Sequence, residues 1–132
     1  MVTKQFRGSP EDADLTRADS LAREIFSDIA NKWALLIIEA LGEGTLRFGE
    51  LRKEIDGISH KMLTQNLRMM ERNGLVERHV HPTVPPRVEY TLTEPGAALR
   101  VTVDSMCDWT HRYLGDIEAS RSRFGSGPAA SG

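Results

Sequence analysis

Residues 47–78 of the chain read RFGELRKEIDGISHKMLTQNLRMMERNGLVER. In this stretch Phe48, Leu51 and Ile55 recur at spacings of three and four, which predicts a short amphipathic helix with these side chains facing a core. The Asp-Gly pair at positions 56 and 57 ends that helix, because glycine readily adopts the backbone conformations found in turns. A short helix followed by a tight turn is the first half of a helix-turn-helix.

The second half is a longer helix that begins after Ser59 and ends near Asn73. Serine is a preferred N-cap, and Gly74 stands where a left-handed residue commonly closes a helix. The inner face of this helix is apolar, whereas its opposite face carries polar and basic side chains at spacings of three and four. The outer residues are Lys61, Thr64, Gln65, Arg68 and Arg72.

A β-hairpin is expected directly after this helix. Residues 75–80 and 87–92 are rich in β-forming side chains, and the loop between them, HPTVPP, contains three prolines that stiffen its tip. A hairpin behind a helix-turn-helix is a wing. Thr93 and Pro95 then suit the N-cap and first turn of a long final helix.

Two further helices are expected before the helix-turn-helix. Apolar residues at helical spacing predict the first from Asp19 or Ser20 onward, and residues 31–41 carry apolar side chains around most of the circumference, which is typical of a buried helix. Leu46 is expected in a short strand. The predicted fold class is therefore mainly α with a small β-hairpin: a winged helix-turn-helix with N- and C-terminal dimerisation helices.

The two ends of the chain differ from this domain in composition. Residues 1–17 are polar with an acidic cluster and predict a flexible arm, and residues 120–132 are rich in Ser, Gly and Ala and predict a disordered tail. Residues 18–119 form the predicted folded domain. No membrane span or signal peptide is expected, and Cys107 is the only cysteine. We therefore expect a soluble cytoplasmic protein.

Charge is unevenly distributed along the chain. The formal net charge is −2, but residues 44–90 carry eight Lys or Arg against six Asp or Glu, so this segment is +2 and the remainder is −4. Because a phosphate backbone attracts cations, the helix-turn-helix and wing are the part of the chain suited to DNA. A mild asymmetry of this kind also occurs on ordinary solvated surfaces.

The outer face of the second helix carries side-chain types that read DNA. Arg and Lys donate to guanine, Gln pairs with adenine, and Thr contacts a base edge or a thymine methyl group. We expect this helix in the major groove with its N-terminus on a phosphate, Arg87 in a minor groove and His81 beside the wing tip. The predicted DNA-binding residues are Arg47, Lys53, Ser59, His60, Lys61, Thr64, Gln65, Arg68, Arg72, His81 and Arg87.

A solvated amphipathic helix and hairpin without a DNA role are the alternative interpretation of these residues. The helix-turn-helix and wing together favour DNA contact. His79 and His81 occupy alternating strand positions with no third ligand nearby in sequence, so no metal site is predicted. No glycine-rich phosphate loop, nucleophile elbow or other catalytic motif occurs, so we expect neither enzymatic activity nor a cofactor.

The final helix repeats one set of residues at spacings of four and three, which is a heptad-like pattern, and the first helix has an apolar face of its own. Both faces exceed what one small domain needs, so we predict a homodimer interface. Packing of both helices on their own domain is the alternative. The predicted interface residues are Leu21, Ile25, Leu99, Val103, Met106, Thr110, Tyr113 and Ile117.

Two groups of residues near this predicted interface have competing interpretations. Phe26, Trp33, Met106 and Trp109 are predicted to line an apolar pocket for a small-molecule effector, although aromatic residues at helical spacing more often form plain core. Cys107 lies among apolar neighbours in sequence and is interpreted as a buried, inert thiol rather than a redox sensor.

Three segments together resemble the HxlR family of winged-helix regulators, relatives of the MarR type. They are NKWALLIIEAL at 31–41, the stretch 46–78, and PPRVEYTLTEPGAAL at 85–99. The resemblance implies a dimer that pairs through its first and last helices and binds an inverted-repeat operator in double-stranded DNA. Redox-sensing members carry a cysteine about a dozen residues before the Lys-Trp pair, where this chain has Ser20 or Leu21. Thiol sensing by that route is therefore not expected.

The sequence predicts a sequence-specific transcription regulator, and a winged helix that binds another protein without a DNA role is the main alternative. Protein-binding surfaces are enriched in aromatic side chains. The outer face of residues 59–72 has no aromatic side chain except His60, which favours the DNA-binding interpretation.

Overall fold

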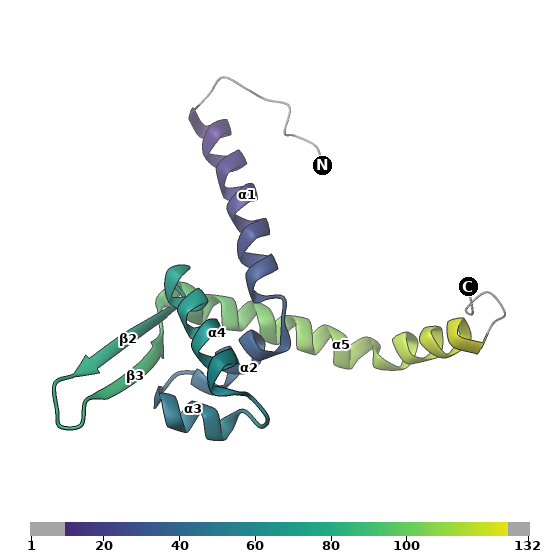
Figure 1. Ribbon diagram of the computed structural model, residues 1–132. Helices are drawn as coiled ribbons and strands as arrows, with labels where there is room; N and C mark the ends of the chain where they lie inside the picture. Colours follow the sequence, from purple (N-terminus) through teal and green to yellow (C-terminus); the bar gives the residue numbers. More distant parts are fainter. Residues whose placement is uncertain (1–9, 127–132) are drawn as a thin grey trace. The chain divides into compact units, whose positions relative to one another are not determined.

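The computed structural model describes residues 10–126, which form five helices and three strands (Figure 1). Two compact units meet in sequence between Ala97 and Ala98. In chain order the elements are α1 (Pro10–Ile29), α2 (Lys32–Leu41), β1 (Thr45–Arg47), α3 (Phe48–Glu54), α4 (His60–Arg72), β2 (Val76–His81), β3 (Arg87–Leu92) and α5 (Glu94–Ser126).

Side-chain caps fix the starts of three helices. The side-chain oxygen of Asn31 accepts a hydrogen bond from the Ala34 N–H at 2.9 Å, and Ser59 Oγ accepts one from the Met62 N–H at 3.0 Å. Thr93 Oγ1 accepts from the Gly96 N–H at 3.1 Å. Each cap satisfies a backbone donor that has no partner within its helix. The predicted caps at Ser59 and Thr93 are confirmed.

The sheet has the order β1-β3-β2 and both pairings are antiparallel. His81 pairs with Arg87 at the end of the hairpin beside the loop, and Leu46 of β1 pairs with Tyr90 of β3. The hairpin predicted from the sequence is therefore confirmed, with β2 one residue later than expected, and the short strand at Leu46 closes the sheet on its other edge.

The core of the first unit lies where α2, α3 and α4 meet. Its largest fully buried side chains are all aliphatic or methionine: Ile37, Ile38, Leu41, Leu51, Leu63 and Met70. Burial of one such side chain contributes about 1.5–3 kcal/mol, so this cluster holds both helices of the helix-turn-helix on α2. The outer faces of α3 and α4 remain available to solvent.

One glycine permits close packing at the start of α5. A Cβ added at Gly96 would collide with the backbone carbonyl oxygen of Leu75 and would press on the Leu92 side chain. Thr93 Oγ1 also donates to the Gly74 carbonyl oxygen at 2.6 Å, in the turn that leads from α4 into β2. The first turn of α5 is thus fastened to the base of the wing.

Two helix ends differ from the prediction. The helix α1 begins at Pro10, although residues up to 17 were expected to form a flexible arm. Proline is favoured in the first helical turn, and Glu11 and Asp12 in that turn complement the helix dipole, so the acidic cluster acts as a helix start. The helix α5 continues to Ser126, beyond the expected end near residue 119. The remaining parts of the predicted arm and tail, 1–9 and 127–132, lie outside the described residues.

The long helix α5 departs from regular geometry at Tyr113, whose backbone angles are φ −108° and ψ 16°. The break lies within the heptad-like pattern. Cys107 is exposed in α5, so its interpretation as a buried thiol was wrong. Its apolar neighbours in sequence, including Met106 and Trp109, are themselves exposed and do not enclose it. No helix in the described part of the chain is long and apolar enough to cross a membrane.

Candidate nucleic-acid interface

Most of the predicted DNA-binding side chains on the outer face of α4 are exposed to solvent. Lys61, Gln65 and Arg68 are exposed, and Thr64 is half-buried. Within residues 10–126, neither Lys61 nor Arg68 forms an ion pair. The side chains of Lys61, Gln65 and Arg68 are therefore available to a ligand.

The N-terminal end of α4 is held in place by two contacts. Ser59 Oγ accepts the capping hydrogen bond from the Met62 N–H, which leaves the hydroxyl hydrogen available to an acceptor such as a phosphate oxygen. The His60 ring lies against Phe48 of α3, with ring centroids 4.8 Å apart and planes tilted by 50°. This contact fixes the first residue of α4 against the preceding helix.

The C-terminal end of α4 is tied to α1 through one carboxylate. Asp28 Oδ2 accepts hydrogen bonds from Arg72 Nη2 and from Asn73 Nδ2, each at 3.1 Å. Asn31 Nδ2 donates to the Asp28 backbone carbonyl oxygen, also at 3.1 Å. Arg72, one of the predicted DNA-binding residues, therefore has a protein partner already. Sequence reasoning missed Asp28, since 44 residues separate it from Arg72.

A buried amide inside α4 was also not anticipated from the sequence. Asn66 is 6% exposed, and its Nδ2 donates to the Met62 carbonyl oxygen one turn earlier at 2.9 Å. A buried polar group costs free energy unless it is hydrogen-bonded, and this bond meets that need within the helix.

The two predicted DNA-binding residues of the wing share one carboxylate. His81 Nε2 lies 2.8 Å from Glu89 Oε1, and Arg87 Nε lies 3.4 Å from Glu89 Oε2. The hydrogen bond from His81 is the main cause that lowers the pKa of Glu89, while the charges of His81, Arg87 and Arg47 add to it and burial opposes it. Glu89, which sequence reasoning missed, therefore neutralises part of the positive charge of the wing.

The start of α3 faces the wing loop across a shallow hollow of about 520 Å³, whose lining includes Arg47, Gly49, Pro85 and Arg87. Arg47 and Lys53 are both exposed. The backbone N–H of Arg47 donates to Glu50 Oε1 at 2.8 Å and so starts α3. Arg47, the last residue of β1 and the N-cap of α3, and Lys53 near the end of α3 thus stand at opposite ends of one short helix.

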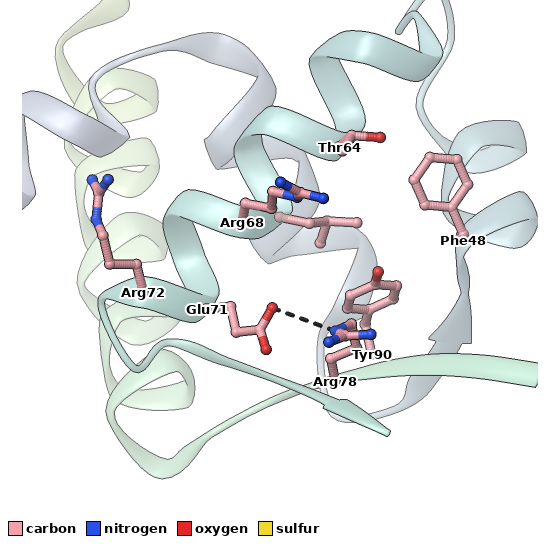
Figure 2. A pocket seen from close by; sticks show the side chains of 8 residues that line it. Phe48, Thr64, Arg68, Glu71, Arg72, Arg78 and Tyr90 are labelled. Carbon is pink, nitrogen blue, oxygen red and sulfur yellow. Dashed lines mark ion pairs between the residues drawn. The ribbon is translucent and has the colours of Figure 1, made fainter. Parts of the chain in front are cut away.

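A second hollow, which we call the α4 hollow, lies between the outer face of α4 and the base of the wing. Its volume is about 500 Å³, and Figure 2 shows the Tyr90 hydroxyl between Phe48 and Arg68 while Arg72 points away from them. Burial is the main cause that raises the pKa of Tyr90, which keeps its hydroxyl protonated. The lining residues are Phe48, Thr64, Leu67, Arg68, Glu71, Arg72, Arg78 and Tyr90.

Of the residues that line this hollow, sequence reasoning assigned only Thr64, Arg68 and Arg72 to a site. Arg78 and Tyr90 face each other across the hairpin in the β2–β3 register. Period-two alternation places Arg78 on the strand face opposite to that of Glu77 and His79, which was a usable signal. The place of Phe48 in the lining of this hollow could not be predicted from the sequence, because core packing explained its position in α3 equally well.

The winged helix-turn-helix architecture matches a known family over most of its length. The model of the HxlR-like helix-turn-helix family matches residues 28–118. The chain belongs to this family. It is a transcription regulator of the HxlR type, with a helix-turn-helix of the DNA-binding kind.

Relatives of this HxlR-like regulator include proteins with solved structures. The HTH-type transcriptional regulator YtfH of Escherichia coli is 41% identical over 100 residues, which cover 76% of this chain and 79% of YtfH. The structure of ytfH from Salmonella typhimurium has 39% identity and a TM-score of 0.67, and the match covers 76% of this chain and 90% of that one. The reduced form of the regulator YodB from B. subtilis has 36% identity and a TM-score of 0.63, with coverages of 81% and 95%.

The residues predicted for dimerisation of this HxlR-like regulator differ in exposure. In α1, Leu21 is 52% exposed and Ile25 is half-buried. In α5, Val103 is buried and Leu99 and Ile117 are half-buried, whereas Met106, Thr110 and Tyr113 are exposed. The assignment of these eight residues to an interface stays a prediction.

The residues predicted for an effector pocket belong to both units. In the first unit Phe26 is 58% exposed and Trp33 is half-buried, with Lys32 Nζ 4.6 Å from its ring centroid. In the second unit Met106 and Trp109 are exposed, and Trp109 packs on Tyr113 with centroids 5.9 Å apart. The pocket stays a prediction. Among residues 10–126, no group of three His, Cys, Asp or Glu side chains is arranged to hold a metal ion.

Proposed function

We propose that this HxlR-like regulator binds an inverted-repeat DNA operator as a homodimer, with α4 in the major groove and the β2–β3 wing along the adjacent minor groove. The observation that carries the proposal is the outer face of α4. There Lys61, Gln65 and Arg68 are exposed on a helix that is capped at Ser59 and packed on the core by Leu63. A rigid helix with free donors on its outer face is the arrangement that reads base edges.

The two parts of this interface have separate roles in the proposal. Gln65 and Arg68 read base edges in the major groove, because their side chains offer paired hydrogen-bonding groups. Arg47 at the N-cap of α3 and Lys53 within α3 contact phosphates, together with the Ser59 hydroxyl and the α4 N-terminus. Arg87 and His81 approach the minor groove from the loop end of the wing, where they pair across the hairpin. Their shared carboxylate, Glu89, reduces the charge that they present there.

The homodimer is proposed from the apolar side chains that α1 and α5 leave exposed. Leu15, Leu21 and Phe26 on α1 are each more than half exposed, as are Met106 and Trp109 on α5. Large apolar surfaces of this kind mark interaction sites in small soluble proteins. Two copies of one helix-turn-helix would place their α4 helices about 34–36 Å apart on one face of the DNA, which requires a two-fold symmetric operator.

A small-molecule effector is a secondary part of the proposal. Phe26, Trp33, Met106 and Trp109 are the side chains that we expect to contact it, since aromatic and methionine side chains bind apolar ligands. An aromatic ligand that releases the operator should also raise the melting temperature of the free protein. A Trp109→Ala variant should lose that rise.

A winged helix that binds a protein partner is the competing candidate. Its supporting observation is the same exposed apolar surface on α1 and α5. The outer face of α4 opposes it, because Lys61, Gln65 and Arg68 offer hydrogen bonds and charge rather than apolar area.

A salt-titrated binding assay on operator and scrambled duplexes tests the DNA proposal. Gln65→Ala and Arg68→Ala should each weaken operator binding by about 1–3 kcal/mol and leave scrambled-duplex binding nearly unchanged. Lys53→Ala is the matched control, because loss of a phosphate contact should weaken both duplexes alike. If all three variants bind both duplexes as the parent does, the protein-interaction candidate is the better account.

A further inference from the structure

The α4 hollow brings cations from two different elements around one opening. Arg68 and Arg72 come from α4 and Arg78 comes from β2, while Glu71 is the single acid of the lining. Three arginines and one glutamate give the lining a formal charge of +2. Phe48 and Leu67 add apolar surface to this lining. An oxyanion attached to an apolar group fits such a mixture of charge and apolar area.

The three arginines differ in their existing partners. Arg72 donates a hydrogen bond to Asp28, and its side chain points away from the hollow in Figure 2. Arg78 Nε lies 3.6 Å from Glu71 Oε1, in a pair whose side chains are 45% and 41% exposed. Arg68 has no ion pair among the residues that the structure describes. A ligand in the hollow therefore meets one free guanidinium, from Arg68, and one weakly held guanidinium, from Arg78.

We propose that the α4 hollow binds a phosphate group of the DNA backbone, and that Arg78 leaves Glu71 for that phosphate when DNA binds. This inference rests on the proposed function, because it requires α4 in the major groove. A sugar-phosphate strand separates a major groove from the adjacent minor groove, so it must cross between α4 and the wing. The α4 hollow lies between those two elements.

The exchange of partners follows from the strengths of the two pairs. An exposed carboxylate–guanidinium pair at 3.6 Å is long for a hydrogen bond and is screened by water and salt. A phosphodiester offers Arg78 two oxygens in a fork geometry, which makes shorter charge-assisted bonds. Arg68 stays on the base edges, as in the proposed function, so Arg78 is the guanidinium that moves to the phosphate.

Glu71 and Tyr90 have opposite effects in this arrangement. Glu71 repels an entering phosphate and competes for Arg78, so it lowers affinity for every duplex regardless of sequence. The Tyr90 side chain is only 8% exposed and its hydroxyl stays protonated, so it donates a hydrogen bond to a phosphate oxygen without adding charge. Glu71 thus limits non-specific binding, and Tyr90 positions the phosphate.

The test compares four variants of the full chain in salt-titrated binding to operator and scrambled duplexes. Arg78→Gln should weaken both duplexes equally and lower the slope of log K against log salt by about 0.9 units, which is the loss of one phosphate contact. Glu71→Gln should tighten both duplexes by about threefold at low salt, since it frees one cation for such a contact. Tyr90→Phe should weaken both duplexes without changing the slope.

Glu77→Gln is the matched control for Glu71→Gln. It makes the same chemical change one residue from Arg78, but on the strand face that Glu77 shares with His79, and Glu77 pairs with His79 rather than with an arginine. It should leave both affinities nearly unchanged. Equal tightening by Glu71→Gln and Glu77→Gln would overturn the inference, because the effect would then be one of net charge alone.

Separate outcomes identify which claim fails. If the parent binds duplex DNA and Arg78→Gln keeps the full salt slope, the phosphate site is wrong and the proposed function stands. If the parent binds no duplex, both are wrong. Inorganic phosphate added to the free protein is the remaining arm. The contrary result is that phosphate raises the melting temperature of the parent but not that of Arg78→Gln, while Arg78→Gln keeps the salt slope of the parent for DNA. That result would assign the hollow to free phosphate and would overturn the DNA backbone as its ligand.

Discussion

The helix α4 and the wing hold their basic side chains in different ways. On α4, Lys61 and Arg68 form no ion pair with any described residue, although the helix itself is fixed by its cap and its core contacts. On the wing, Arg87 and His81 share Glu89. A rigid backbone with free side chains suits the reading of bases, whereas side chains held by a carboxylate suit a weaker contact that yields to a nearby phosphate.

The largest expected effect concerns the support beneath α4. Leu63 is fully buried, and Leu63→Ala should lower the free energy of unfolding by about 2–5 kcal/mol because it leaves a cavity in the core. Val84→Ala is the control at the wing tip, where Val84 is fully exposed and the change should be close to zero. Urea denaturation of both variants measures the contrast. Similar losses in the two would mean that the wing tip supports the fold as much as α4 does.

The next effect concerns the C-terminal end of α4. Asp28→Ala removes the acceptor of two hydrogen bonds, from Arg72 and Asn73, and should lower the free energy of unfolding by about 1 kcal/mol. Asp14→Ala is the control, since Asp14 pairs with Arg17 on the exposed surface of α1 and should contribute little. A loss in Asp28→Ala no larger than that in Asp14→Ala would show that the end of α4 is not held by this carboxylate.

A smaller effect should appear in the acid stability of the wing. The folded-state pKa of Glu89 lies below the ordinary value of 4.5 for a glutamate, so its ionised form stabilises the folded state above about pH 4.5. That contribution is lost as the pH falls through the folded-state pKa. Glu89→Gln should therefore reduce the change in stability with pH in this acid window, as measured by thermal melts from pH 6 to pH 3. Glu77→Gln should keep the dependence of the parent.

The smallest expected effect is at Cys107. The thiol is exposed and has no second cysteine in the chain with which to form a disulfide, so Cys107→Ser should leave stability and operator binding unchanged. Binding assays with and without an oxidant measure this. An oxidant that releases operator from the parent but not from the serine variant would instead show an intermolecular thiol switch.

The sequence predicted those features of the fold that depend on neighbouring residues. The Ser59 cap, the wing strand at residues 87–92 and the buried helix after Asn31 all follow from local patterns of spacing and capping. The start of α1 was missed because Pro10 and the acids after it fit both a polar arm and a helix start. Local composition does not separate these two cases.

The candidate site was predicted less completely, for a physical reason. The cations of α4 and the wing follow from helix and strand periodicity, but their acidic partners lie across the fold. Glu89 reaches His81 diagonally across the hairpin, and Asp28 reaches Arg72 from another helix. The Asp28–Arg72 contact depends on tertiary packing, and no spacing rule within one element reveals it. Arg87 and Glu89 stand two residues apart on β3, so period-two alternation was a usable signal for that pair.

The hydrogen bonds from the end of α4 to Asp28 also limit how far the axis of this helix can tilt. At a rise of 1.5 Å per residue its 13 residues span roughly 20 Å, so a tilt of about 10° about the Asp28 end would move the other end by roughly 3.4 Å. That displacement equals about one base-pair step of B-form DNA. With α4 in a major groove, as we propose, a small angular error at this carboxylate would therefore become a register error of one whole base pair.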